Sequence, residues 1–184
     1  MKKIIMLVCL LMVGVGKASS PDGNEFTKMR LEYAVSPQAI LHWMSSDERK
    51  LLVELYPFDK KKFVEAGDKW LEKCPVDARI QMMMAGAMGE LGRAKETVKY
   101  SYYFYGLMQS VIADNDGLSK ASAFKVISAD EEYALCNYLN AKVVKQELDG
   151  FYDVVQVEIK GKKKKLYFDV SIPLKGIKTE VKEN

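Results

Sequence analysis

The chain has 184 residues, of which 48% are hydrophobic and 29% are charged, with 28 Lys and Arg against 25 Asp and Glu. This length and composition suit one domain that buries its own hydrophobic core. They exclude a chain that folds only with a structural metal or a disulfide framework.

The first 20 residues have the three parts of a secretory signal peptide: Lys2 and Lys3, an apolar run over 4–16, and small residues at 18–20. The run is too short for a membrane span, which needs about 20 apolar residues, and no later segment approaches that length. Cys9 lies inside the run rather than at its exit, which argues against a lipid anchor. We expect an exported protein, periplasmic or extracellular, without a membrane span.

Removal of the signal peptide takes away three of the 28 basic residues and no acidic one, which leaves 25 against 25. A near-neutral protein is not expected to bind nucleic acid. The lysine-rich run 160–165 could hold an anionic surface. We favour a solvated hairpin loop whose charge keeps a sheet edge from pairing with other chains.

The mature chain is expected to begin with a flexible lead-in over 21–35, because that stretch opens with the turn formers P-D-G-N. A single α+β domain is expected over 36–172, followed by a loose tail over 173–184. Its helical part, 36–113, starts with Ser36 and Pro37 as helix cap and first turn. The apolar residues of 40–44 supply the buried side of that first helix.

Further helices are expected after a capping box at Ser45 and Glu48, and then over 59–73, 76–91 and 98–113. The last of these is apolar nearly all round, so it must be covered on two flanks. We expect earlier helices on one flank and a sheet on the other. Four turn formers, D-N-D-G at 114–117, should end it near Ala113.

The sheet part, 114–172, begins with a strand over 123–128. Ser128 and Glu131 then form a capping box for a helix over 129–139 that buries Tyr133, Leu135 and Cys136. Residues 143–148 alternate as a strand, and 155–159 with 166–172 form a hairpin with one apolar face. These strands predict a small, mainly antiparallel sheet with one helix.

The region from Phe63 through the L-G-R turn at 91–93 resembles tetratricopeptide-like helical hairpins, with small residues where the helices cross. No 34-residue period repeats, so a short bundle of helical hairpins explains the same pattern. A second resemblance is carried by the run D-G-L-S at 116–119, A-F-K-V-I-S at 123–128, D-E-E-Y at 130–133 and Y-F-D at 167–169. This run resembles an exported bacterial family, mainly of Bacteroidetes, catalogued as domain of unknown function 4919. The resemblance implies export and a helical region followed by a small sheet, and no activity.

The D-N-D-G turn is the best local candidate for chemistry. Asp114 and Asp116 have the spacing that starts a calcium loop, but the later ligands of such a loop are missing. Turn formation is the preferred interpretation. Ser119 lacks the elbow and the base of a nucleophilic serine, so we expect its hydroxyl to cap a backbone amide.

Tyrosines 100, 102, 103 and 105 could line a groove for a glycan or a peptide, with Tyr102 and Tyr103 as the candidates. At helical spacing the four cannot share one face, so some must lie in the core. The methionines of 82–88 could bind copper(I), but core filling is the preferred interpretation. The single histidine, His42, supports no catalytic triad or metal site.

Cys74 and Cys136 are the cysteines left after export, and the sequence is compatible with a disulfide or with two buried thiols. No cofactor is expected. We interpret the protein as a non-catalytic binding or scaffold module of the cell envelope, with an unknown protein or glycan partner. The alternatives are a hydrolase that uses carboxylates we cannot identify and, below it, a calcium- or copper-binding protein.

Overall fold

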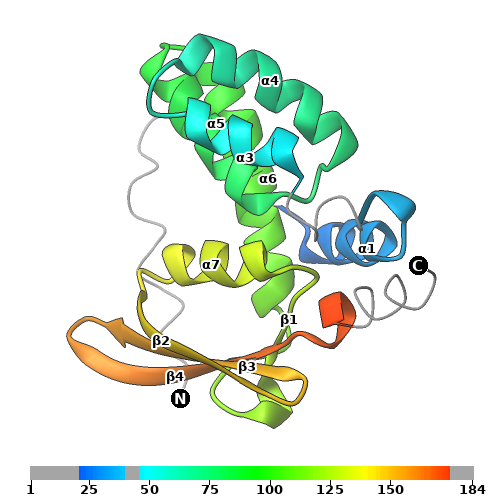
Figure 1. The fold of residues 1–184 in the computed structure, drawn as a ribbon, viewed down its shortest axis with the longest axis vertical. Coiled ribbons are helices and arrows are strands. Elements are labelled where there is room, and N and C mark those ends of the chain that lie inside the picture. The colour runs from blue at the N-terminus through cyan, green and yellow to red at the C-terminus, as the bar shows by residue number, and fades with distance from the viewer. Residues whose placement is uncertain (1–20, 40–45, 175–184) are drawn as a thin grey trace.

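The computed structural model describes residues 21–39 and 46–174 (Figure 1). The main elements in chain order are α1 (Gly23–Ala34), α3 (Asp47–Leu55), α4 (Lys60–Lys73), α5 (Ala78–Glu90), α6 (Ala94–Ile112), the 3₁₀ turn η1 (Lys120–Ser122), β1 (Phe124–Lys125), α7 (Ala129–Tyr138), β2 (Lys142–Asp149), β3 (Tyr152–Ile159) and β4 (Lys162–Asp169). Helices come first and the sheet follows, so the fold is α+β, as predicted.

The expected flexible lead-in is wrong, because most of residues 21–35 form helix α1. Asp22 caps the helix by accepting a hydrogen bond from the Asn24 amide at 2.9 Å. Three side chains spaced by four residues share one buried face: Phe26, Arg30 and Ala34. Burial of this face supplies the stability that the turn-forming start of the helix lacks.

The three helices that follow each begin with a side-chain cap, which explains why their start points could be predicted. Ser46, rather than the expected Ser45, caps α3 through the Arg49 amide at 3.2 Å. Asp59 caps α4 and Asp77 caps α5. The apolar side chains expected at 40–44, and His42 among them, lie outside the described residues.

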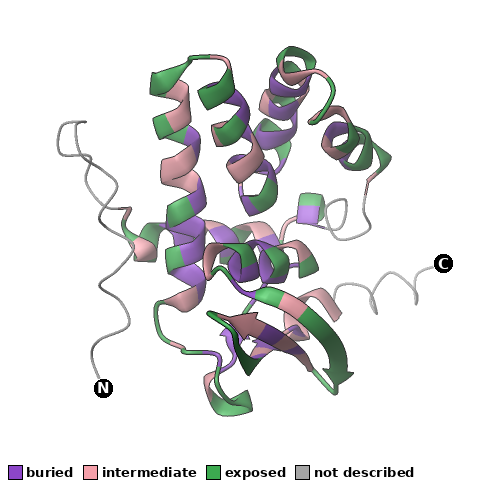
Figure 2. Ribbon diagram, turned by 90° about the vertical axis from the view of Figure 1, so that its left-hand side faces the viewer, coloured by how far each residue is buried: buried purple, intermediate pink, exposed green. Residues whose placement is uncertain are grey.

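Helix α6 runs from the helical part down to the level of α7 (Figure 1), and much of its C-terminal half is buried (Figure 2). It packs along α5, it contacts α1 through Gly106 and Phe26, and it meets α7 and β1 farther along. The expectation of a sheet along one flank was therefore wrong in detail. Helix α7 covers the sheet, and the sheet touches α6 chiefly through the short strand β1.

The sheet has the strand order β1-β4-β3-β2, with β1 parallel to β4 and the other pairs antiparallel. Its face toward α7 carries apolar side chains, all buried: Val155, Val157, Leu166 and Phe168. Ser128 caps α7, as predicted, and Leu135 and Cys136 are buried. Tyr133 is 45% exposed, so its predicted burial was wrong.

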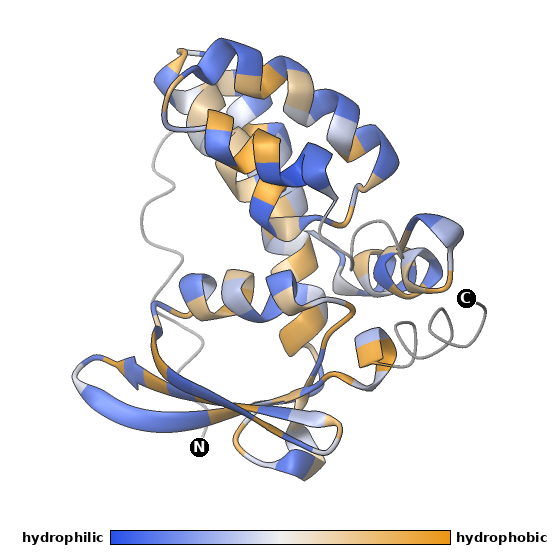
Figure 3. Ribbon diagram, in the orientation of Figure 1, coloured by the Kyte–Doolittle hydropathy of each residue, from blue (hydrophilic) through white to orange (hydrophobic). Residues whose placement is uncertain are grey.

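The lysine-rich run is mostly strand rather than loop. Lys160 and Gly161 make the hairpin turn, and Lys162–Lys165 form the hydrophilic half of β4 (Figure 3). Strand β1 pairs with β4 only at Phe168 and Asp169. The lysine half of β4 therefore has no described neighbour on that side, and its charge suits an open strand edge.

The sulfur-containing residues of the described chain lie in or beside the core. Met84 and Met88 are buried, and the Met84 sulfur packs onto Gly67 of α4. Cys74 and Cys136 are buried, and no disulfide joins them. Residues 171–174 add one helical turn where a loose tail was expected from 173, and the remainder of that tail lies outside the described residues.

Candidate functional site: an open groove beside helix α1

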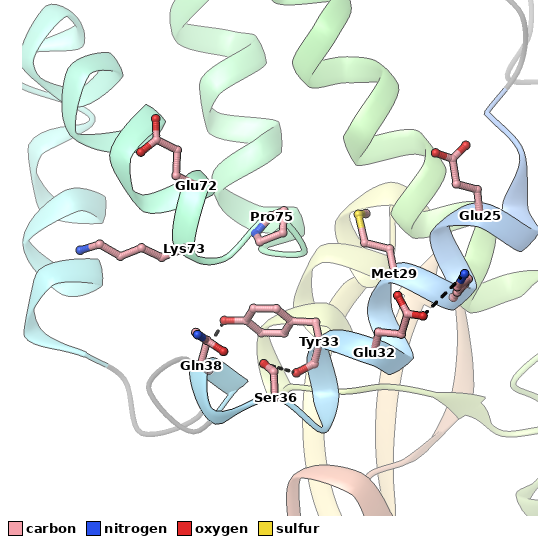
Figure 4. Close-up of a pocket in the computed structure, with 10 residues that line it drawn as sticks. Glu25, Met29, Glu32, Tyr33, Ser36, Gln38, Glu72, Lys73 and Pro75 are labelled. Carbon is pink, nitrogen blue, oxygen red and sulfur yellow. Dashed lines mark hydrogen bonds and ion pairs between the residues drawn. The ribbon is translucent and has the colours of Figure 1, made fainter.

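A pocket of about 770 Å³ lies between α1 and the segment that joins α4 to α5 (Figure 4). It is open to solvent on one side. The residues that line it are Glu25, Lys28, Met29, Glu32, Tyr33, Ser36, Gln38, Glu72, Lys73 and Pro75. We call this set the α1 groove.

Two local hydrogen bonds shape the end of α1 that borders the groove. The Ser36 hydroxyl donates to the Tyr33 carbonyl at 2.7 Å, and the Tyr33 hydroxyl donates to the Gln38 carbonyl at 3.2 Å (Figure 4). Both bonds join residues at most five positions apart, so local interactions fix the conformation of this part of the chain. Pro75 cannot continue α4 and therefore turns the chain at the opposite wall.

Tyr33, which lines the groove, is a neutral group. Tyr33 is half-buried, and its hydroxyl also forms a hydrogen bond with the buried Cys74 thiol. Burial, followed by the interaction with Cys74, raises the pKa of Tyr33. Burial, followed by the nearby charge of Asp77, raises the pKa of Cys74. Neither group is ionised at neutral pH, and Cys74 is buried outside the groove lining, so it offers the groove no thiolate nucleophile.

The rim of the groove carries charges of both signs. Lys28 lies 3.7 Å from Glu32, and Lys73 binds Glu48 of α3 at 2.9 Å. All these groups are exposed. Met29 and Pro75 place apolar surface between the charges. This mixture suits a ligand that has both apolar and charged side chains.

The buried carboxylates of the helical part serve the fold rather than the groove. Asp77 accepts from Arg49 Nε at 2.6 Å, from Trp70 Nε1 at 2.9 Å and from the Ile80 amide at 3.1 Å. Arg49 reaches on to Asp130 of α7 at 3.1 Å. This buried network ties α3, α4 and α5 to α7.

A second buried ion pair anchors α1. Arg30 donates to both carboxylate oxygens of Glu131 at 2.7 Å, and to the Lys125 carbonyl at 2.9 Å. Glu131 also accepts from the Ile127 amide at 2.9 Å. This bidentate pair joins α1 to β1 and α7, and its oxygens are occupied by structural partners.

The side chains of the D-N-D-G segment stabilise a turn. Asp116 accepts from the Leu118 amide at 3.0 Å and from the Ser122 hydroxyl at 2.7 Å, and these bonds lower its pKa. Asp114 is exposed. Ser119 caps η1 by accepting from the Ser122 amide at 3.2 Å, as predicted. Within residues 21–39 and 46–174, no three His, Cys, Asp or Glu side chains gather as a metal site would require.

The tyrosines of α6 pack against different neighbours, and a binding role for Tyr102 and Tyr103 stays a prediction. Tyr102 and Tyr103 both pack edge-on against Phe26 of α1, with ring centroids 5.6 and 5.7 Å away. Tyr100 is buried, and Tyr105 packs against Tyr138. The sequence did not predict the α1 groove. The available signal was Phe26, Met29, Arg30 and Tyr33, a helical spacing inside the stretch that we expected to be flexible.

The structure thus defines the class: an α+β domain in which a bundle of helices precedes a small mixed sheet covered by one helix. The chain belongs to the family described as domain of unknown function DUF4919, whose model matches residues 33–179. No curated protein and no solved structure matches the chain. The tetratricopeptide-like resemblance stays a prediction. In the described ranges, the helices are too short or too polar to cross a membrane.

Proposed function

We propose that this protein is a non-catalytic binding module of the cell envelope, exported by its N-terminal signal, and that the α1 groove holds an extended stretch of a partner protein. The observation that carries the proposal is the composition of the groove. It combines an open shape, the neutral side chain of Tyr33 among its lining residues, and a rim of mixed charge. These features suit recognition of a polypeptide more than bond cleavage.

A glycan partner gains less support than a peptide. Glycan sites depend on aromatic rings that stack on a sugar face, and the groove has one such ring, Tyr33. The tyrosines of α6 that could have served this role are packed against α1 or against one another.

The hydrolase alternative needs two carboxyl groups that face one cavity in different protonation states. The carboxylates of the groove, Glu25, Glu32 and Glu72, are exposed. Asp77 and Glu131 are buried against arginines, and the adjacent carboxyl groups of Glu132 and Asp153 lie between α7 and β3, so none of these four lines the groove. The geometry therefore favours binding over hydrolysis.

Site-specific photo-crosslinking in living cells tests the proposal. A photoreactive amino acid at Gln38 or at Glu72 faces the groove, and one at Lys61, exposed on α4 and outside the groove lining, is the matched control. We expect the same envelope protein to be captured from both groove positions and not from Lys61. Capture of nothing at the groove, or of the same proteins at all three positions, would contradict the proposal. Fractionation of the same cells tests export.

A further inference from the structure

Strand β2 is the last strand of the sheet, and its outer edge is open. It pairs with β3 on one side, and in residues 21–39 and 46–174 no strand pairs with the other. It is eight residues long. Its outward backbone N–H and C=O groups are therefore available to another strand, which is the geometry used in strand addition.

The side chains of β2 are unusually exposed for a strand that carries apolar residues. Val144 is 52% exposed and Leu148 is 59% exposed. Between them, Lys145 binds Glu147 at 3.1 Å on the same face of the strand. Gln146 points to the other face, where it accepts a hydrogen bond from Tyr133 of α7 at 2.7 Å. The order along the edge is thus apolar, basic, polar, acidic, apolar.

Read in either direction, this order is apolar, charged, polar, charged, apolar, and the two charges have opposite signs. When two identical strands pair antiparallel about a two-fold axis at the polar residue, each basic residue therefore lies opposite an acidic one. In an antiparallel pair, two residues lie opposite each other only if the backbone N–H and C=O groups of both point toward the partner strand or both point away from it. These two orientations alternate along a strand, so the numbers of two opposite residues must be both odd or both even. With Gln146 opposite its own copy, Lys145 lies opposite Glu147 twice and Val144 lies opposite Leu148 twice. A register centred on Lys145 or on Glu147 would place like charges face to face.

We infer that β2 is a self-association edge: two copies of this protein pair through their β2 strands, antiparallel, about a two-fold axis at Gln146. The two sheets then continue into one. Lys145 and Glu147 of each copy form a square in which every neighbour has the opposite sign. Val144 and Leu148 cover each other at the two ends. This inference makes no use of the α1 groove.

The bulge of β2 sets the length of the contact. The ladder between β2 and β3 shifts between Val143 and Lys145, so the regular part of β2 runs from Lys145 to the end of the strand. Within this regular part, the symmetric pairing about Gln146 covers residues 145–147, and Val144 and Leu148 flank it. A contact this short gives a weak dimer that forms at high concentration.

Charge exchange tests the register directly. Lys145→Glu and Glu147→Lys each put two like-charged pairs across the axis, and we expect each to weaken the dimer by about tenfold or more in sedimentation equilibrium. The double variant Lys145→Glu/Glu147→Lys restores opposite charges and should recover the dimer. A mixture of the two single variants should recover the dimer too. In a mixed dimer, the two acidic residues of Lys145→Glu lie opposite the two basic residues of Glu147→Lys.

The matched control is Lys163→Glu, a charge reversal on β4, two strands away from this edge. It should leave the dimer unchanged, and circular dichroism should show that all variants are folded. A wild-type chain that stays monomeric at its highest soluble concentration would overturn the inference. So would a dimer that the single reversals do not weaken, or a mixture of single variants that stays monomeric.

Discussion

Glu132 on α7 and Asp153 on β3 are hydrogen-bonded to each other by their carboxyl groups, at the point where the helix covers the sheet. Glu132 is buried, and apart from this contact its Oε2 atom and the Asp153 Oδ1 atom have no hydrogen-bond partner among the described residues. Two adjacent carboxylates cannot both be charged there at low cost. Burial, and then the charge of Asp153, raises the pKa of Glu132 to about 8.

This pair predicts that the protein loses stability as the pH rises. Between the unfolded pKa near 4.5 and the folded pKa of about 8, the folded state keeps a proton that the unfolded state has released. The free energy of unfolding should therefore fall across that interval, by roughly 1–4 kcal/mol, and level off above it. Urea unfolding at about pH 5 and at about pH 9 measures the difference.

Glu132→Gln should remove most of this dependence, because an amide can donate to Asp153 at any pH. The exposed Glu65 of α4 provides the control substitution, Glu65→Gln, which should leave the wild-type slope intact. If the free energy of unfolding changes with pH equally in wild type and in Glu132→Gln, the prediction that Glu132 and Asp153 hold a proton in the folded state is contradicted.

Loss of the Asp77 carboxylate should destabilise the protein strongly. Asp77→Ala leaves the Arg49 guanidinium, 8% exposed, without its main partner, and removes the cap of α5. An uncompensated buried charge costs roughly 3–5 kcal/mol, whereas the exposed pair of Lys73 and Glu48 is worth about 1 kcal/mol or less. Chemical denaturation of Asp77→Ala and Lys73→Ala should show this contrast, and similar losses in both would contradict it.

The close contact of α1 with α6 should be sensitive to a single methyl group. A Cβ at Gly106 would overlap the ring of Phe26, so Gly106→Ala must displace that ring or the helix that carries it. We expect a loss of about 1–3 kcal/mol, measured as a lower midpoint of thermal unfolding. Gly23→Ala is the control, since a Cβ there meets open space. The double variant Phe26→Leu/Gly106→Ala should be more stable than Gly106→Ala alone.

The lysines of β4 should protect the open half of that strand from aggregation. Replacing Lys163 and Lys165 with threonine keeps strand propensity and removes two charges from the open edge. We expect faster aggregation on mild heating, followed by light scattering. Replacing Lys61 and Lys62 of α4 in the same way changes the net charge equally, and should not produce this effect.

Local chemistry accounts for the elements that were predicted correctly. Asp59, Asp77 and Ser128 each cap the helix that follows them, and alternation over 155–159 and 166–172 identified the hairpin. Each of these signals joins residues close in the chain, so neighbouring residues suffice to recognise it.

The errors have a common cause in partners that are distant in the chain. Arg30 is buried because Glu131, 101 residues later, takes its charge, and without that pair α1 resembled a solvated lead-in. Glu131 was predicted as part of a helix cap, but the sequence did not indicate that it also pairs with Arg30. The α1 groove was missed for the same reason, since its walls come from α1 and from the α4–α5 connection.

Helix and strand positions follow from side-chain spacing and capping, whose energies come from contacts within a few residues. The open edge of β2, the proton held between Glu132 and Asp153, and the groove beside α1 follow from which surfaces meet after the chain folds back on itself. Such tertiary contacts depend on burial and pairing of residues that are far apart in the sequence, which no local pattern encodes.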